Sequence, residues 1–276
     1  MTDPMATLDV EQLSVAFPGR PVLRDVSFSL RPGEFCGLIG SNGSGKTTLL
    51  RTILGLQAPS AGTVRIGGHS GAGRRGLMGY VPQKIGFETE MPLRARDVVA
   101  LGLDGARLGL SFPSRVRTRK VEEMLEAVDA QAFADQRISD LSGGQQQRIL
   151  IAHAMIRRPK LLLLDEPLAN LDVAAVADIV HLLHWFAHEE GITILVSAHD
   201  MNPLLGVMDR IVYLAQGRAA TGRTEEVVRT EVLSRLYGHH IDVIRVHGRV
   251  LVVAAGAADE IPIAMERHPV HVCEIP

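Results

Sequence analysis

The sequence is poor in the residues that staple small secreted domains or stack on bases. Its 276 residues include two cysteines, Cys36 and Cys273, too few for a disulfide framework. Aromatic residues make up 4% and the net charge is −2, so neither base stacking nor a basic field favours nucleic acid as a partner. No apolar run approaches the about 18 residues that cross a bilayer. The polar start "MTDPMATLDVEQ" also lacks the segments of a secretory signal. We therefore expect a soluble, cytoplasmic protein, which does not exclude docking on a membrane protein.

What the sequence does contain is a series of short apolar runs that alternate with helical patterns. "EFCGLIG" (34–40), "KLLLLDEP" (160–167) and "ITILVSAH" (192–199) predict buried strands. Helical periodicity marks residues 46–56, 92–140 and 173–186. This alternation predicts an α/β fold whose parallel sheet is covered on both faces. Cys36 then becomes a buried, inert thiol.

The two ends of the chain have different patterns. Residues 8–30 alternate loosely around the turn "FPGRP", which predicts two paired strands. "TEEVVRTEVLSRLYG" (224–238) predicts a helix, and the following "IDVIRVHGRVLVVAA" is β-like. The last fifteen residues are poorly patterned, and we expect them to be loosely ordered.

The stretch "GSNGSGKTT" (40–48) joins a predicted strand to a predicted helix and matches the pattern G-x-x-x-x-G-K-[ST]. Glycines allow successive backbone N–H groups to turn around a polyphosphate, and the helix N-terminus adds a partial positive charge. The lysine reaches the β- and γ-phosphates, and the first threonine hydroxyl is a ligand for Mg²⁺. A glycine-rich turn that binds nothing is the alternative. The predicted phosphate contacts are Gly40, Ser41, Asn42, Gly43, Ser44, Gly45, Lys46, Thr47 and Thr48.

Two acids, Asp165 and Glu166, end the buried run "LLLLDE". The carboxyl ends of parallel strands face the crevice in which α/β sheets bind ligands. Asp165 suits Mg²⁺, which prefers oxygen ligands, and Glu166 is placed to act as general base toward a water molecule. The alternative is a pair of surface or helix-capping acids.

A third motif narrows the class of protein. "LSGGQQQR" (141–148) resembles the signature of ATP-binding cassette (ABC) ATPases. Other elements of that family follow its order: Gln83 in "YVPQK", "LDEP" (164–167), "NLD" (170–172) and His199 in "SAHD". The resemblance covers about residues 8–220.

The resemblance implies an ATPase domain at 1–220, with a mixed or parallel sheet core, an antiparallel β subdomain and a helical signature subdomain at about 92–158. Residues 221–276 would form a C-terminal helix and β extension. Family members pair head to tail around two ATP molecules, so one phosphate loop and one signature imply a homodimer. The residues that would complete the site of the opposite chain are Ser142, Gly143, Gly144, Gln145 and Asp172.

The resemblance also assigns roles to three further residues. Gln83 would contact Mg²⁺ or the attacking water and report occupancy of the site to a partner. His199 would hydrogen-bond the γ-phosphate, with a satisfied core histidine as the alternative. Phe17 would stack on adenine, with an ordinary core phenylalanine as the alternative.

A chain of this kind requires a separate membrane permease and, in an importer, an extracytoplasmic solute-binding protein. It would then act at the cytoplasmic face of the cell membrane. Residues 80–102 and 233–253 resemble importers of zinc, manganese or iron, and iron-chelate importers are the nearest alternative. Soluble cassette ATPases of DNA repair usually carry a coiled-coil insertion and those of translation two cassettes; neither feature is present here. The intact signature argues against a P-loop kinase or GTPase.

The tail suggests a metal sensor, because it is rich in metal-binding residue types. Their spacing is irregular, so we favour incidental, solvated histidines. The residues concerned are His239, His240, His247, His268, His271 and Cys273.

Overall fold

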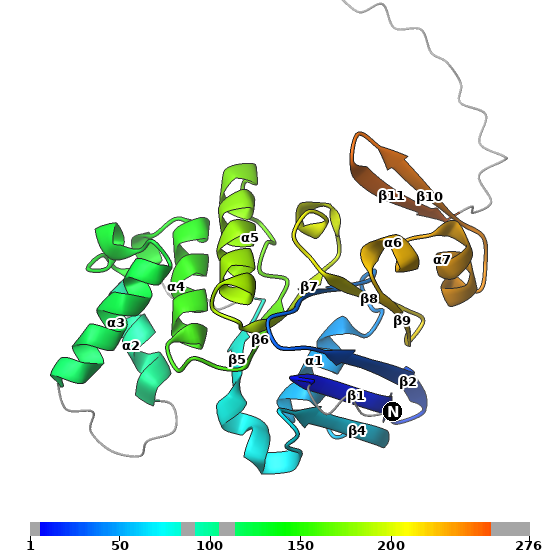
Figure 1. The fold of residues 1–276 in the computed structure, drawn as a ribbon, viewed down its shortest axis with the longest axis horizontal. Coiled ribbons are helices and arrows are strands. Elements are labelled where there is room, and N and C mark those ends of the chain that lie inside the picture. Colours follow the sequence, from blue (N-terminus) through cyan, green and yellow to red (C-terminus); the bar gives the residue numbers. More distant parts are fainter. Residues whose placement is uncertain (1–5, 84–91, 105–113, 255–276) are drawn as a thin grey trace, which may run out of the picture.

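A six-stranded sheet in the order β5-β6-β7-β3-β8-β9 forms the centre of the protein (Figure 1). The computed structural model describes residues 6–83, 92–104 and 114–254. The strands are β3 (Phe35–Ile39), β5 (Met78–Val81), β6 (Leu161–Asp165), β7 (Thr193–Ala198), β8 (Arg210–Ala215) and β9 (Arg218–Gly222). All neighbours are parallel except β9, which is antiparallel to β8. The predicted α/β class is confirmed.

The continuous apolar runs are explained by burial on both faces of this sheet. Leu162 and Leu164 of β6 belong to a core that includes helices α4 (Gly143–Met155) and α5 (Val173–His188). Leu161 and Leu163 point the other way, into a second core with helix α1 (Lys46–Leu54). A strand with polar residues on either face would leave one of these cores unfilled.

A second, antiparallel sheet closes the core beneath α1. Its order is β2-β1-β4, formed by β1 (Leu8–Phe17), β2 (Arg20–Leu30) and β4 (Ala61–Ile66). The predicted turn joins β1 to β2, and Gly19 in it has a φ of 75°. A 3₁₀ helix, η1 (Gly71–Leu77), then leads into β5.

The helices of the signature region lie together at one side of the central sheet (Figure 1). Helices α2 (Ala95–Asp104) and α3 (Arg115–Ala127) pack on α4, and the short turns η2 (Gln131–Phe133) and η3 (Ile138–Asp140) connect them. Val121 and Leu125 are buried, as their spacing predicts. Across the described ranges, no helix combines the length and the apolar character required to cross a membrane.

The C-terminal region differs from the prediction in one respect. Instead of one helix over 224–238 there are two, α6 (Thr224–Val227) and α7 (Thr230–Tyr237). The helix ends at Val228, whose ψ of 70° is not helical. Val227 and Val228 are both buried, whereas one continuous helix would turn them about 100° apart.

Strands β10 (Ile241–Val246) and β11 (Arg249–Ala254) follow as an antiparallel hairpin. Its two-residue turn, His247 and Gly248, has φ values of 49° and 77°, as a type I′ turn requires. The last fifteen residues, with His268, His271 and Cys273, lie outside the described residues.

Candidate nucleotide site

The loop between β3 and α1 exposes backbone donors rather than side chains. Gly43 and Gly45 have φ values of 79° and 111°, in the region that favours glycine. A Cβ on Gly40 would lie 2.4 Å from the carbonyl oxygen of Leu214, so this approach also requires glycine. Gly45 caps α1 without any side-chain hydrogen bond. The N–H groups of the first helical turn are therefore open to an anionic ligand.

Lys46 lies folded into this loop. Its Nζ donates to the carbonyl oxygens of Gly40, at 2.7 Å, and Ser41, at 3.3 Å. Glu166 Oε1 lies 3.8 Å from the same nitrogen. Burial lowers the pKa of Lys46, and the carboxylates of Glu166 and Asp165 oppose that shift. Lys46 is the only cationic residue of the loop. Phosphate oxygens of a bound ligand would replace the two carbonyl oxygens as acceptors for its Nζ.

Ser44 gives a second indication that the loop is built for a ligand. Its hydroxyl oxygen is buried and has no hydrogen-bond partner among the described residues. A buried hydroxyl without a partner costs about 1–3 kcal/mol. An oxygen-rich ligand in the loop would satisfy it.

The two acids occupy different positions at the end of β6. Asp165 is buried and accepts a 2.7 Å hydrogen bond from the hydroxyl of Ser197 on β7. The same hydroxyl accepts a 2.9 Å bond from the backbone N–H of Glu166. Glu166 has a φ of 49°, and its Oε2 accepts a 2.7 Å bond from Gln83 Nε2. Ser197, which no sequence motif marks, therefore bonds to both acidic residues.

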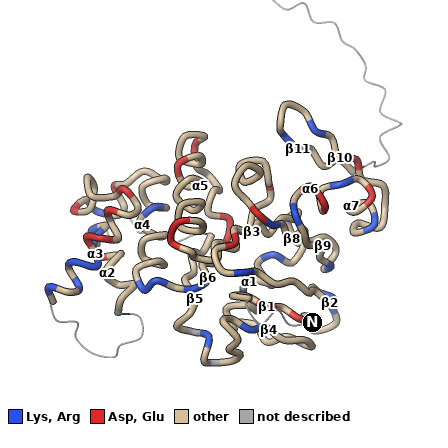
Figure 2. The backbone as a smooth tube through the Cα atoms, in the orientation of Figure 1, with Lys and Arg blue, Asp and Glu red and all other residues tan. Residues whose placement is uncertain are grey.

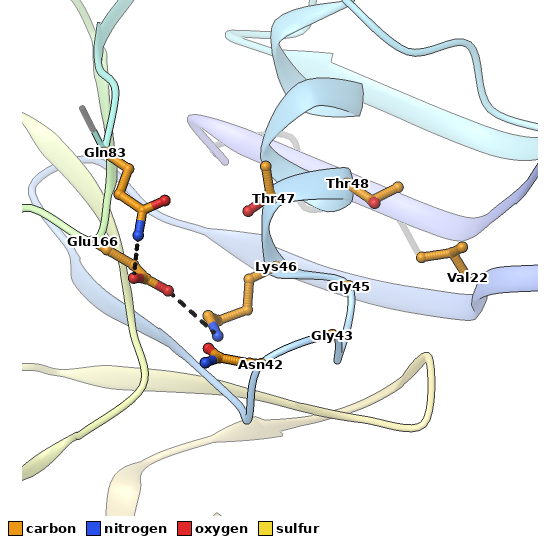
Figure 3. Close-up of a pocket in the computed structure, with 9 residues that line it drawn as sticks. All are labelled: Val22, Asn42, Gly43, Gly45, Lys46, Thr47, Thr48, Gln83 and Glu166. Atoms are coloured by element: carbon orange, nitrogen blue, oxygen red, sulfur yellow. Dashed lines mark hydrogen bonds and ion pairs between the residues drawn. The ribbon is translucent and has the colours of Figure 1, made fainter. Parts of the chain in front are cut away.

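These groups converge on a pocket of about 400 Å³ (Figure 3). Gln83 and Glu166 face Lys46 across the loop, and the two threonines reach the pocket from α1. Neither Asp165 nor His199 is among the lining residues. The pocket is lined by Val22, Asn42, Gly43, Gly45, Lys46, Thr47, Thr48, Gln83 and Glu166.

The oxygen donors at this pocket fit Mg²⁺ bound together with phosphate. Within the described ranges, no group of three or more His, Cys, Asp or Glu side chains could hold a metal ion. Mg²⁺ does not need such a cage, since it takes one or two carboxylates and completes its shell with phosphate oxygens and water. The Thr47 hydroxyl, the Gln83 amide oxygen and the Asp165 carboxylate are donors of the required kind.

The signature forms a separate structural unit. Ser142 is the N-cap of α4: its hydroxyl accepts from Gln145 N at 3.3 Å, and its own N–H donates to Gln145 Oε1 at 2.9 Å. Asp172 caps α5 in the same way, accepting from Ala175 N at 2.8 Å. A Cβ on Gly144 would lie 2.9 Å from that of Ala175. Two helix N-termini are therefore packed side by side, outside the phosphate pocket of their own chain.

Two alternatives from the sequence are wrong. Phe17 is 44% exposed at the end of β1, so it is not a core residue. His199 is also exposed, at the end of β7, so it is not a satisfied core histidine.

Val173, placed on the buried side of its helix by the periodicity, is 89% exposed because it is the first residue of α5 and precedes the packed turns. Cys36 is buried as predicted, and burial raises the pKa of its thiol.

Comparisons with known proteins identify the family of the chain. Residues 23–169 match the family described as ABC transporter. The chain is 35% identical to the manganese transport system ATP-binding protein MntB of Bacillus subtilis (strain 168), over 87% of this chain and 96% of that protein. It is 33% identical to the zinc import ATP-binding protein ZnuC of Yersinia enterocolitica, over 92% and 99%. An inward-facing ABC transporter described as metal-chelate type superposes with a TM-score of 0.75 at 25% identity, over 90% of this chain and 96% of that one.

The fold and the pocket define a P-loop ATPase of the ATP-binding cassette class. The chain belongs to the ABC transporter family. The predicted family, fold class and ATPase activity are thereby confirmed.

Proposed function

We propose that this chain is the ATP-hydrolysing subunit that powers uptake of a transition metal ion, manganese or zinc, through a separate permease. The observation that carries the ATPase part is the convergence of Lys46, Gln83 and Glu166 on one pocket beside the phosphate loop. The metal part rests on relatives whose names specify manganese transport and zinc import.

In this proposal the loop N–H groups, Lys46 and the Ser44 hydroxyl hold the phosphates. Thr47, Gln83 and Asp165 would hold Mg²⁺, which withdraws negative charge from the phosphates. Glu166 takes a proton from a water molecule while the oxygen of that water bonds to the γ-phosphorus. The bond between the γ-phosphorus and the oxygen that bridges to the β-phosphate breaks, and ADP leaves. Gln83 donates to Glu166 and so sets the direction of that carboxylate.

The signature residues and Asp172 would contact the ATP that is held by a second copy of the chain. Ser142 uses its oxygen as an acceptor in the helix cap, which leaves its proton available to a phosphate. Gly143, Gly144 and Asp172 would approach the γ-phosphate and the interface from the same side. In the chain that holds the phosphates, His199 would donate to the γ-phosphate, and exposed Phe17 would stack on adenine.

The pair of chains would work at the cytoplasmic face of the membrane, on a permease served by an extracytoplasmic solute-binding protein. We assign ATP hydrolysis to residues 1–220, coupling to the permease to the helical part at about 92–158, and an accessory role to 221–276. A metal-chelate cargo is the second candidate, favoured by the solved transporter of that type.

Replacement of the base, Glu166→Gln, tests the ATPase mechanism. We expect ATP binding to persist, hydrolysis to be lost, and a dimer to accumulate with ATP and Mg²⁺. Glu189→Gln, an exposed acid at the far end of α5, is the matched control and should turn over normally. Turnover by Glu166→Gln would show that another group is the base.

The cargo is tested separately with the permease complex in vesicles. Stimulation of ATPase activity and uptake by Mn²⁺ or Zn²⁺ would support the ion; stimulation by an iron chelate alone would support the second candidate.

A further inference from the structure

The C-terminal hairpin has one face that is docked on the rest of the protein. Val250 and Ile241 on this face are 4% and 2% exposed. The side chain of Asn202, in the turn η4 (Asn202–Leu204), holds the backbone of Val250 through hydrogen bonds of 2.7 and 3.1 Å. This face carries the cross-strand pairs Ile241–Ala254, Val243–Val252 and Arg245–Val250.

The opposite face is apolar and exposed. It carries the pairs Asp242–Val253, Ile244–Leu251 and Val246–Arg249. Four aliphatic side chains form a contiguous strip on it, with exposures of 45% for Ile244, 44% for Val246, 51% for Leu251 and 45% for Val253. A two-stranded ribbon is marginally stable by itself, and a contiguous apolar strip of this kind marks a docking surface. Figure 1 shows the ribbon standing at the end of the molecule opposite α2 and α3.

The charges at the edges of this strip identify its occupant. Asp242 stands at one corner, and Arg249 at the diagonally opposite corner, beside the turn. In Figure 2 basic residues lie toward the free end of the ribbon and an acidic one toward its base. Suppose that a second copy is related to the first by a two-fold axis that lies between the two facing strips. Asp242 of each chain can then lie over Arg249 of the other chain. We propose that this face pairs with the same face of a second chain.

The geometry of such a pair is that of ordinary sheet packing. Placing each Asp242 over the Arg249 of the other chain fixes the angle between the two hairpins. From the strand rise and the strand spacing, the strands of one hairpin lie about 40° from antiparallel to those of the other. Aligned sheets pack at about 30°, so the apolar side chains would interdigitate normally. Asp242 also accepts a 3.1 Å hydrogen bond from His240, but a carboxylate accepts several donors.

The strip is too small to hold two chains together unaided. Stable interfaces bury about 800 Å² on each partner, more than four half-exposed side chains supply. The hairpin contact therefore adds to the ATP-dependent pairing, and in this sense it rests on the proposed function. While the nucleotide sites are open, the hairpins pair weakly and reversibly, and each encounter raises the effective concentration of one ATPase domain near the other.

Cross-linking between two different variants tests the pairing in the full-length chain. Asp242→Cys and Arg249→Cys are made separately in a Cys273→Ser background, in which Cys36 is buried. A bismaleimide spanning about 8 Å can join thiols on sheets about 10 Å apart. The mixture should give a cross-linked dimer without nucleotide, whereas each variant alone should not, because identical corners on the two facing sheets lie about 17 Å apart. Arg235→Cys, exposed on α7, replaces Arg249→Cys as the control.

Loss of the cross-link upon adding Leu251→Asp, but not Leu56→Asp, would support the apolar contact; Leu56 is 73% exposed and remote. Absence of the cross-link, or equal cross-linking with Arg235→Cys, would overturn the proposal. Leu251→Cys should react with a maleimide in dilute protein and become protected as concentration rises. Protection at every concentration would mean that residues 255–276 cover the strip, and would also overturn it. The ATP-trapped dimer of Glu166→Gln is measured in parallel, so failure of the proposed function would be seen independently.

Discussion

Ser197→Ala should damage catalysis through two residues that it does not replace. The hydroxyl of Ser197 donates to Asp165 Oδ1 and accepts from the N–H of Glu166, at 2.7 and 2.9 Å, and the residue is fully buried. Alanine removes both bonds and leaves a buried carboxylate oxygen and a buried N–H without this partner. Such losses cost about 1–3 kcal/mol each, so we expect the two together to lower the unfolding free energy by about 2–6 kcal/mol.

The effect on activity should exceed the effect on folding. Without Ser197 the Asp165 carboxylate and the strained backbone of Glu166, with its φ of 49°, are free to shift. We expect a fall in kcat of about 10- to 100-fold, as for other groups that orient ligands of a metal. A higher Mg²⁺ concentration should be needed for half-maximal activity. The assays are ATPase activity titrated with Mg²⁺ and urea unfolding of the same preparation.

Thr193→Val is the matched control for Ser197→Ala. Thr193 lies on the same strand, is equally buried, and donates at 2.9 Å to the carbonyl of Arg31, away from the pocket. This variant should lose stability but keep its Mg²⁺ dependence and its activity per folded molecule. If Ser197→Ala behaved in the same way, the positioning role of Ser197 would be refuted.

Three other outcomes can be measured. Burial lowers the pKa of Lys46 below its ordinary value of 10.5, so just below pH 10.5 the unfolded chain binds more protons than the folded chain. The free energy of unfolding should therefore rise with pH in that range. Lys46→Met should lack this rise and should also lose ATP affinity. Gly144→Ala should weaken ATP-dependent dimerisation by displacing α5, and Ala175→Gly should restore it, since the two Cβ atoms would be 2.9 Å apart; failure of this rescue would point to a direct clash with phosphate. Asn202→Ala should speed hydrogen exchange at Val250 by releasing β11, and Asn202→Asp, which keeps the acceptor, should do so less.

The parts of this protein that the sequence predicts are those written in adjacent residues. The phosphate loop is one short run, and its glycine at position 45 has the positive φ that the motif demands. The apolar strand of residues 161–164 is buried on both faces, as its uninterrupted run of leucines predicts. Local patterns of this kind can be predicted from the sequence because they do not depend on contacts with distant segments.

The parts that it misses depend on contacts between distant segments. Ser197 acts on Asp165 across neighbouring parallel strands, and nothing near position 197 in the sequence marks that pairing. The helix break falls at Val228, a buried residue with a non-helical ψ, and helical propensity alone does not predict it. The exposed strip on the hairpin likewise follows from register and docking, since both faces of β10 and β11 are rich in aliphatic residues.

The charges in the nucleotide pocket are arranged so that binding and catalysis cannot be independent. Lys46 now bonds to two loop carbonyls and lies 3.8 Å from Glu166, while Gln83 holds the other carboxylate oxygen. A phosphate group drawn to Lys46 must compete with Glu166 for the same ammonium, and like charges repel across so short a distance. Phosphate binding at Lys46 would therefore weaken the contact between Glu166 and the lysine, and would leave the carboxylate free to accept a proton from water. Because Gln83 Nε2 donates to the same carboxylate, a shift of Glu166 would also change its contact with Gln83, two residues beyond β5.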